Sequence, residues 1–330
     1  MRISFIIPAY NASGTIVRCL DSIYVLPIDE SDYEVIVIDD CSTDNTVEIV
    51  KQFAVKHSNL VLLQQVENHR QGTARNRGLF CSSGQFIMFV DSDDEISKGV
   101  VAAVRMAEEL NLDMVAMRYV KVDNEGQVVE EAQLTYGHNV LFTGIEMQTA
   151  FPFWCTGPSP YIYVKSFLER VNYPFAEEVL FEDSDFVNVH LYHAKRMAYI
   201  DDCGYLYHFN ATSTTHTTSY KHLADYALLG TRMLAFYESL PDKTTKYAES
   251  ILEGGSFNIM KSFRRFVRLN SLADIQAFYD RLDAHYDRSL LLAYKRPTYC
   301  WTRWTRLCLK HRKVATLLSV CFMPLYRIIN

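Results

Sequence analysis

The N-terminal part of the chain alternates short apolar runs with segments in which apolar residues recur every three or four positions. The apolar runs that predict strands lie at 3–7, 34–38, 60–66 and 86–90. Segments with helical spacing follow the first two runs, at 15–26 and 45–55. Near-continuous apolar strands that alternate with amphipathic helices are typical of a mostly parallel sheet with helices on both faces. We therefore predict an α/β domain.

Polar clusters follow three of these predicted strands. They read "PAYN" at 8–11, "DDCSTDN" at 39–45 and "DSDDE" at 91–95. In open α/β sheets the ligand site lies at the carboxyl ends of the strands, so the fold is expected to bring the three clusters together.

The second half of the chain has a different pattern. Residues 113–122 predict a further strand, and "DNEG" at 123–126 predicts a turn into a hairpin strand. From about 219 the pattern becomes helical with few breakers. We predict an α/β domain over 1–215, with halves of about 1–112 and 113–215, and a helical C-terminal extension over 216–330.

Charge is distributed unevenly. The 330 residues carry a net charge of −6, which argues against general nucleic-acid binding, but the segment from Ser289 onward has eight Lys and Arg residues and no acid. A basic segment on an acidic chain favours an anionic surface as partner.

The eight cysteines are scattered and form no CxxC pair, which argues against a zinc site and favours a reducing, cytoplasmic environment. The apolar run at 314–326 is shorter than the roughly 20 residues of a transmembrane helix. We expect no targeting or membrane-spanning segment.

The acidic cluster "DSDD" follows a buried strand, and Asp91 and Asp93 can face the same way in a loop. Carboxylate oxygens suit Mg²⁺ or Mn²⁺, which typically take one or two protein carboxylates and share the rest with a diphosphate. The alternative is a solvated acidic turn that caps the helix predicted at 98–110.

Two other clusters predict contacts with a nucleotide. Asp40 ends a strand and could accept the N–H of a nucleobase, whereas residues 42–45 fit a helix cap. In "ENHRQGTARNRGL" Gly72 permits close backbone approach. Arg75 and Arg77 lie near a helix start, where phosphate binds readily, although surface positions on an ordinary helix are the alternative.

The ordered motifs "FIIPAYN", "VIVIDDCSTDNT", "GTARNRG" and "FIMFVDSDD" closely resemble the family 2 glycosyltransferases with the GT-A fold, of the type found in bacterial polysaccharide biosynthesis. The resemblance is strong over about the first 95 residues and looser to about 215. It implies a nucleotide-diphosphate sugar donor (UDP-sugar), inversion at the anomeric carbon and a divalent cation, Mn²⁺ or Mg²⁺. It makes 1–112 the nucleotide-sugar half and 113–215 the acceptor half.

Together with the residue types, this resemblance assigns the predicted site. Donor-binding residues are Pro8, Ala9, Tyr10, Asn11, Asp40, Gly72, Arg75, Asp91 and Ser92. Metal ligands are Asp91, Asp93 and Asp94.

The family's catalytic base lies in an acidic pair well downstream of the metal-binding acids, here in "LFEDSDF". We predict Asp183 as the base, with Glu182 beside it and Asp185 as the rival. An inverting transfer needs one base for the acceptor hydroxyl, while a metal can neutralise the departing diphosphate. The alternative is that Asp183 caps a helix at 184–195.

Two aromatic-rich segments give further candidates. "YLYHFNATSTT" at 205–215 resembles the family's closing segment, but His208 stands where Arg is expected. His208 is a candidate metal ligand, or else a structural hydrogen-bonding residue. Trp154, in "FPFWCTGPSPYIY", is a candidate for stacking on an acceptor sugar, or else a core aromatic residue.

Residues 301–313 predict a basic amphipathic helix. Trp301, Trp304 and Cys308 share one face, and Arg303, Arg306, Lys310 and Lys313 line another. Anionic lipid would attract such a helix, so 301–326 are predicted to contact an anionic membrane surface, the inner face of the plasma membrane. The alternative is that the apolar face packs on the protein.

The leading hypothesis is a metal-dependent inverting transferase that acts on a glycan or a lipid-linked glycan. A sugar nucleotidyltransferase would carry a Gly-rich basic loop after the first strand, where this chain has "PAYNASGT". A non-catalytic nucleotide-sugar or glycan-binding module would not need Glu182 and Asp183 in addition to Asp91 and Asp93, the acids of the DxD pattern.

Overall fold

The structure is a computed structural model. It describes residues 2–285 apart from 124, 133–139, 152–156, 209–218, 267–268 and 270, and then residues 308, 311–313 and 316. The chain divides into two compact units, Met1–Ala211 and Thr212–Asn330. The boundary predicted near residue 215 lies outside the described residues.

The first four strands of unit 1 form a parallel block. In the order β3-β2-β1-β4 they are Leu60–Gln64, Tyr33–Asp39, Ile3–Ala9 and Phe86–Phe89. All three neighbouring pairs are parallel. The four predicted strands are confirmed, and the buried apolar runs explain why: both faces of the block are covered.

The second half of the sheet changes direction. The order continues β8-β6-β9-β5, with β7 beside β6, over Tyr161–Val164, Met114–Val122, Met197–His208, Glu95–Ile96 and Val128–Ala132. In this half only β6 and β9 pair in parallel. The predicted α/β fold is confirmed, and the sheet is mixed rather than purely parallel. The turn after Val122, where Asp123 N–H donates to Gln127 O at 3.0 Å, is too short for a parallel crossover.

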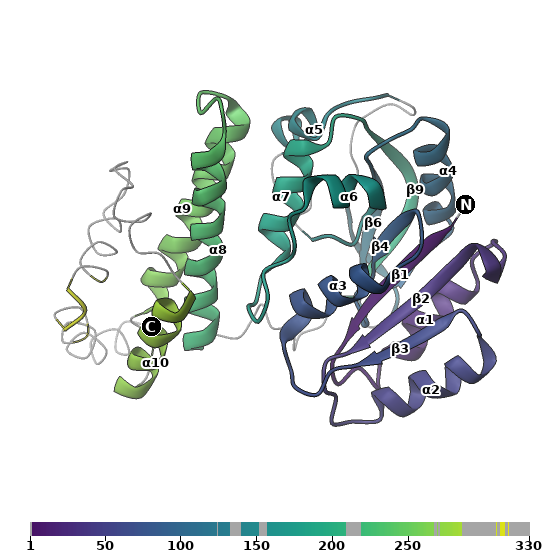
Figure 1. The fold of residues 1–330 in the computed structure, drawn as a ribbon, viewed down its shortest axis with the longest axis horizontal. Helices are drawn as coiled ribbons and strands as arrows, with labels where there is room; N and C mark the ends of the chain where they lie inside the picture. The colour runs from purple at the N-terminus through teal and green to yellow at the C-terminus, as the bar shows by residue number, and fades with distance from the viewer. Residues whose placement is uncertain are drawn as a thin grey trace. The chain divides into compact units, whose positions relative to one another are not determined.

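Helices cover both faces of the sheet (Figure 1). One apolar core takes its helical residues from α1, α2 and α4, over Ile16–Tyr24, Thr46–Lys56 and Gly99–Glu109. The other core takes them from α3, α5, α6 and α7, over Arg70–Cys81, Gly144–Ala150, Lys165–Val171 and Asp183–His193. A short 3-10 turn, η1, spans Glu30–Asp32. The helices α3 and α7 therefore lie on the same side of the sheet.

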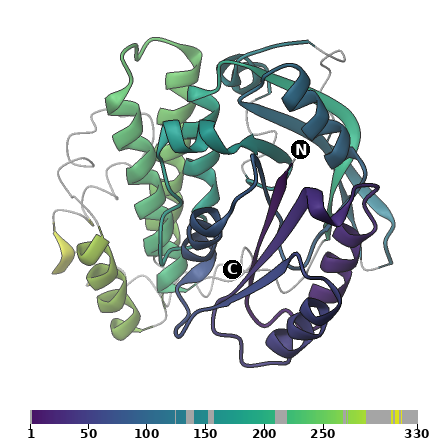
Figure 2. The same cartoon turned by 45° about the vertical axis from the view of Figure 1, so that its right-hand side comes forward.

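Unit 2 is helical in its described part. Helices α8, α9 and α10 span Tyr220–Ser239, Lys246–Phe266 and Leu272–His285. Figure 2 shows α8 and α9 running side by side, and a side chain added at Gly230 would lie 2.5 Å from Gly255 O. Arg281 Nε pairs with the buried Asp225 at 2.6 Å. No helix in the described part of the chain is long and apolar enough to cross a membrane.

The packing of α3 on the sheet depends on Gly78. A methyl group there would lie 2.4 Å from Ile6 Cγ2 and 2.8 Å from Ile38 Cδ1, both in the core. Overpacking costs about 1–3 kcal/mol, and the helix preference of Ala over Gly returns about 1 kcal/mol. We expect Gly78→Ala to lower the free energy of unfolding in urea by up to about 2 kcal/mol. The control is Gly14→Ala, because an added methyl meets nothing within 4 Å. A stabilised Gly78→Ala would contradict this packing.

Candidate active site

Side chains of the first two polar clusters form hydrogen bonds between the loop after β1 and the loop after β2. Thr43 N–H donates to Asn11 Oδ1 at 2.8 Å, and Asn11 N–H donates to Ser42 Oγ at 2.9 Å. Asn11 itself has a left-handed backbone with φ of 49°, which asparagine tolerates better than most residues. The predicted donor residues Pro8 and Ala9 are buried within β1, whereas Tyr10 is 49% exposed. The loop after β1 is thus held by the loop after β2.

Asp44 also connects these two loops. Its carboxylate accepts hydrogen bonds from Ser13 N–H at 3.0 Å and Thr46 N–H at 3.0 Å. Burial alone would raise the pKa of Asp44, but the hydrogen bonds from Thr46 and Ser13 lower it to about 2. The carboxylate stays ionised at the start of α2, which fits the helix-capping role predicted for this segment.

Asp40 holds the start of α3. Its carboxylate accepts from His69 N–H at 2.7 Å, Arg70 N–H at 2.8 Å and the Gln65 side chain at 2.7 Å. Burial raises the pKa of Asp40, although these hydrogen bonds oppose the rise. The sequence suggested a nucleobase contact for Asp40 and gave no sign of this link to α3. The nucleobase contact stays a prediction.

Arg75 joins the acids at the end of β4 to the acids at the start of α7. The side chain is 2% exposed; Nη2 lies 2.7 Å from Asp91 Oδ1, and Nη1 pairs with Glu182 Oε1. Its guanidinium also lies over the ring of Phe175, 5.4 Å from the centroid. Burial alone would lower the pKa of Arg75, but Asp91 and Glu182 raise it above its ordinary value. Arg75 was predicted to bind the donor; here it connects two groups of carboxylates.

The acids of "DSDD" have different surroundings. Asp94 is 1% exposed, and its oxygens accept from Tyr205 Oη at 2.5 Å and His208 N–H at 2.8 Å. Burial and the charges of Asp91 and Asp93 raise its pKa well above the ordinary value. Burial and the charge of Asp91 also raise the pKa of Asp93. Asp91 and Asp93 are only partly buried, which leaves them more accessible to a cation than Asp94.

His208 faces a different acid from those predicted to bind metal. Its Nε2 lies 2.6 Å from Glu95 Oε1, and Arg18 Nε lies 3.3 Å from the same oxygen. Among the residues that the structure describes, no group of three or more His, Cys, Asp or Glu side chains forms a ready-made metal site. The role of His208 as a ligand stays a prediction.

The three downstream acids are distinguished by burial and partners. Glu182 is 5% exposed and pairs with Arg75; Asp185 is 1% exposed and accepts from Tyr173 Oη at 2.8 Å. Asp183 begins α7 and is the most exposed of the three. Burial, followed by the charge of Glu182, raises the pKa of Asp183 to about 7, against the opposing effect of Arg75. A carboxyl group with this pKa can exchange a proton near neutral pH.

Several residues of this site are not predicted from the sequence. Tyr205 Oη contacts both Asp94 and the backbone N–H of Asp91, the latter at 3.3 Å, and Ser159 Oγ lies 3.4 Å from Asp91 Oδ2. Tyr205 belongs to the quoted segment "YLYHF", which was its only sequence signal. Trp154, the candidate acceptor residue, lies outside the described residues.

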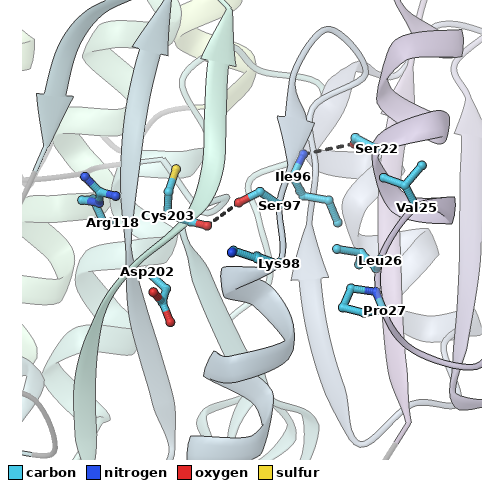
Figure 3. Close-up of a pocket in the computed structure, with 10 residues that line it drawn as sticks. All are labelled: Ser22, Val25, Leu26, Pro27, Ile96, Ser97, Lys98, Arg118, Asp202 and Cys203. Carbon is cyan, nitrogen blue, oxygen red and sulfur yellow. Dashed lines mark hydrogen bonds between the residues drawn. The ribbon is translucent and has the colours of Figure 1, made fainter.

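A separate cavity of about 480 Å³ lies near the C-terminal end of α1 (Figure 3). It is lined by Ser22, Val25, Leu26, Pro27, Ile96, Ser97, Lys98, Arg118, Asp202 and Cys203. None of the predicted site residues lines it, so the acidic site at the strand ends is distinct from this cavity.

Sequence comparison identifies curated relatives of this chain. The chain is 26% identical over 317 residues to the poly(ribitol-phosphate) beta-N-acetylglucosaminyltransferase TarS of Staphylococcus aureus, over 92% of this chain and 53% of TarS. It is also 30% identical over 223 residues to the uncharacterized glycosyltransferase EpsJ of Bacillus subtilis, over 64% of this chain and 62% of EpsJ. The chain thus spans about half the length of TarS.

Solved structures show the same fold. S. aureus TarS 1–349 in complex with UDP-GlcNAc matches with a TM-score of 0.65 at 22% identity, over 99% of this chain and 92% of that one. The mannosyltransferase PcManGT from Pyrobaculum calidifontis, in complex with GDP-Man and Mn²⁺, matches with a TM-score of 0.55 at 17% identity, over 98% and 86%.

The family model "Glycosyl transferase family 2" matches residues 4–169, which is half of the chain. This match covers the strand ends, the DxD acids and Arg75. The chain belongs to glycosyltransferase family 2.

Proposed function

We propose that this protein is an inverting glycosyltransferase that moves a sugar from a nucleotide-diphosphate donor, a UDP-sugar, to a hydroxyl group of a glycan. The observation that carries the proposal is the Asp91–Arg75–Glu182 bridge. It links the acids suited to a metal–diphosphate complex with the acids suited to proton removal, although they lie about ninety residues apart in sequence. A donor-binding module without catalysis would have no need for this link.

The donor end of the site is supported by the loops after β1 and β2. The hydrogen-bonded loops around Asn11 and Thr43 form an edge beside Asp40, where a nucleoside would bind. TarS was solved with UDP-GlcNAc, which supports a uridine donor for this chain as well.

A divalent cation fits Asp91 and Asp93. Burial, followed by the charge of Asp91, raises the pKa of Asp93, and a cation would relieve the repulsion between the two acids. One or two carboxylates are enough for Mg²⁺ or Mn²⁺ when a diphosphate supplies further oxygens. When bound, the metal would neutralise charge on the departing diphosphate. We leave Asp94 out of the metal shell because it is buried, whereas Asp91 and Asp93 are partly exposed. We leave out His208 because its Nε2 contacts Glu95.

Asp183 is the proposed base. It would accept the proton of the acceptor hydroxyl as that oxygen attacks the anomeric carbon of the donor sugar. Its pKa of about 7 supports this role. Asp185 is a weaker candidate, because its carboxylate is buried and bonded to Tyr173.

The acceptor is proposed to be a glycan or a lipid-linked glycan at an anionic membrane surface. Cys308 is fully buried, and its carbonyl accepts a hydrogen bond from Tyr279 Oη at 3.1 Å. Lys313, on the face predicted to be basic, is exposed. These contacts support a tail in which Cys308 packs on α10 while Lys313 stays open to lipid headgroups.

A donor panel tests the reaction class. We expect binding and slow hydrolysis of one UDP-sugar, with weaker responses to GDP- and dTDP-sugars, and loss of turnover in EDTA. Asp93→Asn should lower the apparent affinity for Mn²⁺ at least tenfold. Isothermal titration and release of the nucleoside diphosphate measure these effects. Donor binding without hydrolysis or transfer would favour the binding module, and no nucleotide binding by folded protein would overturn the proposal.

The base is tested by Asp183→Asn. We expect turnover to fall by a factor of about 10²–10⁴, the usual contribution of general base catalysis, with an unchanged donor Kd. In the unsubstituted protein the base must be ionised, so turnover should rise as pH increases through about 7 and level off above it. Asp185→Asn is the matched comparison. Full turnover in Asp183→Asn would remove this residue from catalysis.

Membrane contact is tested with vesicles. We expect the full chain to sediment with vesicles that contain phosphatidylglycerol, and far less with phosphatidylcholine alone. Each basic residue near an anionic surface contributes about 1 kcal/mol, so replacing Arg303, Arg306, Lys310 and Lys313 with Gln should weaken binding at least tenfold. Binding should also weaken at high salt. Equal binding to neutral vesicles would contradict the electrostatic contact.

A further inference from the structure

One face of α3 holds the segment that leads into the downstream acids. Asn76 is central to this contact: its Nδ2 donates to Phe175 O at 3.0 Å, and its Oδ1 accepts from Phe175 N–H at 3.0 Å. The same Nδ2 lies 3.0 Å from Glu177 Oε1. The side-chain amide therefore pairs with a backbone as a neighbouring strand would, and it satisfies both polar groups of Phe175.

Two further contacts lie on the same face of α3, one and two turns before Asn76. At Gly72 an added side chain would lie 2.1 Å from Ala176 O, so the segment runs directly against the helix backbone. At the start of the helix, His69 O accepts from Glu178 N–H at 3.2 Å, and His69 Nδ1 lies 3.0 Å from Glu178 Oε1. Contacts at 69, 72 and 76 follow the spacing of one helix face. We call residues 173–182 the base loop.

The base loop has a backbone that needs outside support. Glu178 and Phe181 have φ values of 59° and 66°, in the left-handed region that non-glycine residues seldom adopt. Each such residue costs about 1–3 kcal/mol and persists only where surrounding contacts fix it. Phe175 supplies one such contact, since its ring stacks on Phe186 of α7 with centroids 3.7 Å apart. The loop ends at Glu182, directly before Asp183.

We propose that Asn76 is a positioning residue that fixes the base loop and thereby the placement of Asp183 for proton removal. The inference rests on the proposed function, because it takes Asp183 as the base. Asn76 touches neither donor nor acceptor in this proposal. It acts through the Phe175 backbone, and its loss should disturb the chemical step more than donor binding. A residue that serves only general stability would instead affect folding without separating these two quantities.

The test combines kinetics with amide hydrogen exchange on the full chain. In Asn76→Ala we expect faster exchange at Phe175 and through the base loop. We expect kcat for transfer to fall about tenfold to hundredfold, the scale of a misplacement of about 1 Å. The Kd for the UDP-sugar should stay within about twofold of the unsubstituted value, because general base catalysis and ground-state binding use different groups. Phe80→Ala is the control, since Phe80 lies on the same helix and is 88% exposed.

A second pair of variants keeps the test usable if Asn76→Ala fails to fold. Asn76→Asp retains the shape and can still accept from Phe175 N–H, but its second oxygen faces Phe175 O and Glu177. We expect Asn76→Asp to lower kcat at least tenfold. Adding Glu177→Lys to this variant should restore kcat to at least a third of the unsubstituted value through an opposite-charge pair. Purely structural damage would not be rescued in this way.

Two outcomes overturn the inference alone: full turnover in Asn76→Ala, or a loss of donor affinity as large as the loss of kcat. Either result would leave Asp183 as the base if Asp183→Asn is inactive. Full turnover in Asp183→Asn would instead overturn the proposed base, and the positioning role would fall with it.

Discussion

The buried guanidinium of Arg75 is the interaction on which the site depends. Two carboxylates from distant segments, Asp91 after β4 and Glu182 before α7, meet at this one side chain. Removing one partner from such a buried group costs about 3–5 kcal/mol, because the remaining charges lose their compensation. The arrangement therefore holds only if β4, α3 and the start of α7 keep their mutual positions. Phe175, under the guanidinium, excludes water from one side of the bridge.

Helix α3 is the element that keeps these positions. Asp40 binds its first N–H groups from the end of β2, and Gly78 lets its last turns pack closely on β1 and β2. The opposite flank, at Gly72 and Asn76, carries the base loop. A shift of α3 at the nucleotide end would thus be transmitted to Arg75 and to the base loop. The helix connects three groups of residues that are far apart in sequence.

The strands and polar clusters of this site could be predicted from the sequence more readily than the contacts between them. The first four strands were found because both of their faces are buried and their residues are almost uniformly apolar. The polar clusters that follow these strands were expected to converge, because parallel strands end at the same edge of the sheet. The partners of Arg75 could not be predicted, since they lie 16 and 107 residues away and local spacing reports neither. The link from Asp40 to α3 could not be predicted, because His69 and Arg70 donate to it through their backbone N–H groups, which the residue types do not reveal. In the mixed half of the sheet, the strand at 113–122 and its hairpin are predicted, whereas β8 and β9 are not, because the aromatic-rich segments that contain them show no clear strand period.

The acids of "DSDD" differ in how far neighbouring residues balance their charges, and this difference sets the chemistry of the cluster. Asp91 is balanced by Arg75, and Asp94 is held by Tyr205 and the His208 N–H. Asp93 has no ion pair among the residues that the structure describes, and its pKa is raised by burial and by Asp91. Arg18 and His208 offset this rise only in part. A stable fold would more simply replace Asp93 with a neutral residue, because a partly compensated charge beside another acid costs free energy. Keeping the acid here makes sense if a cation arrives with the donor diphosphate. Asp93 would then supply a negative charge that Arg18 and His208 balance only in part.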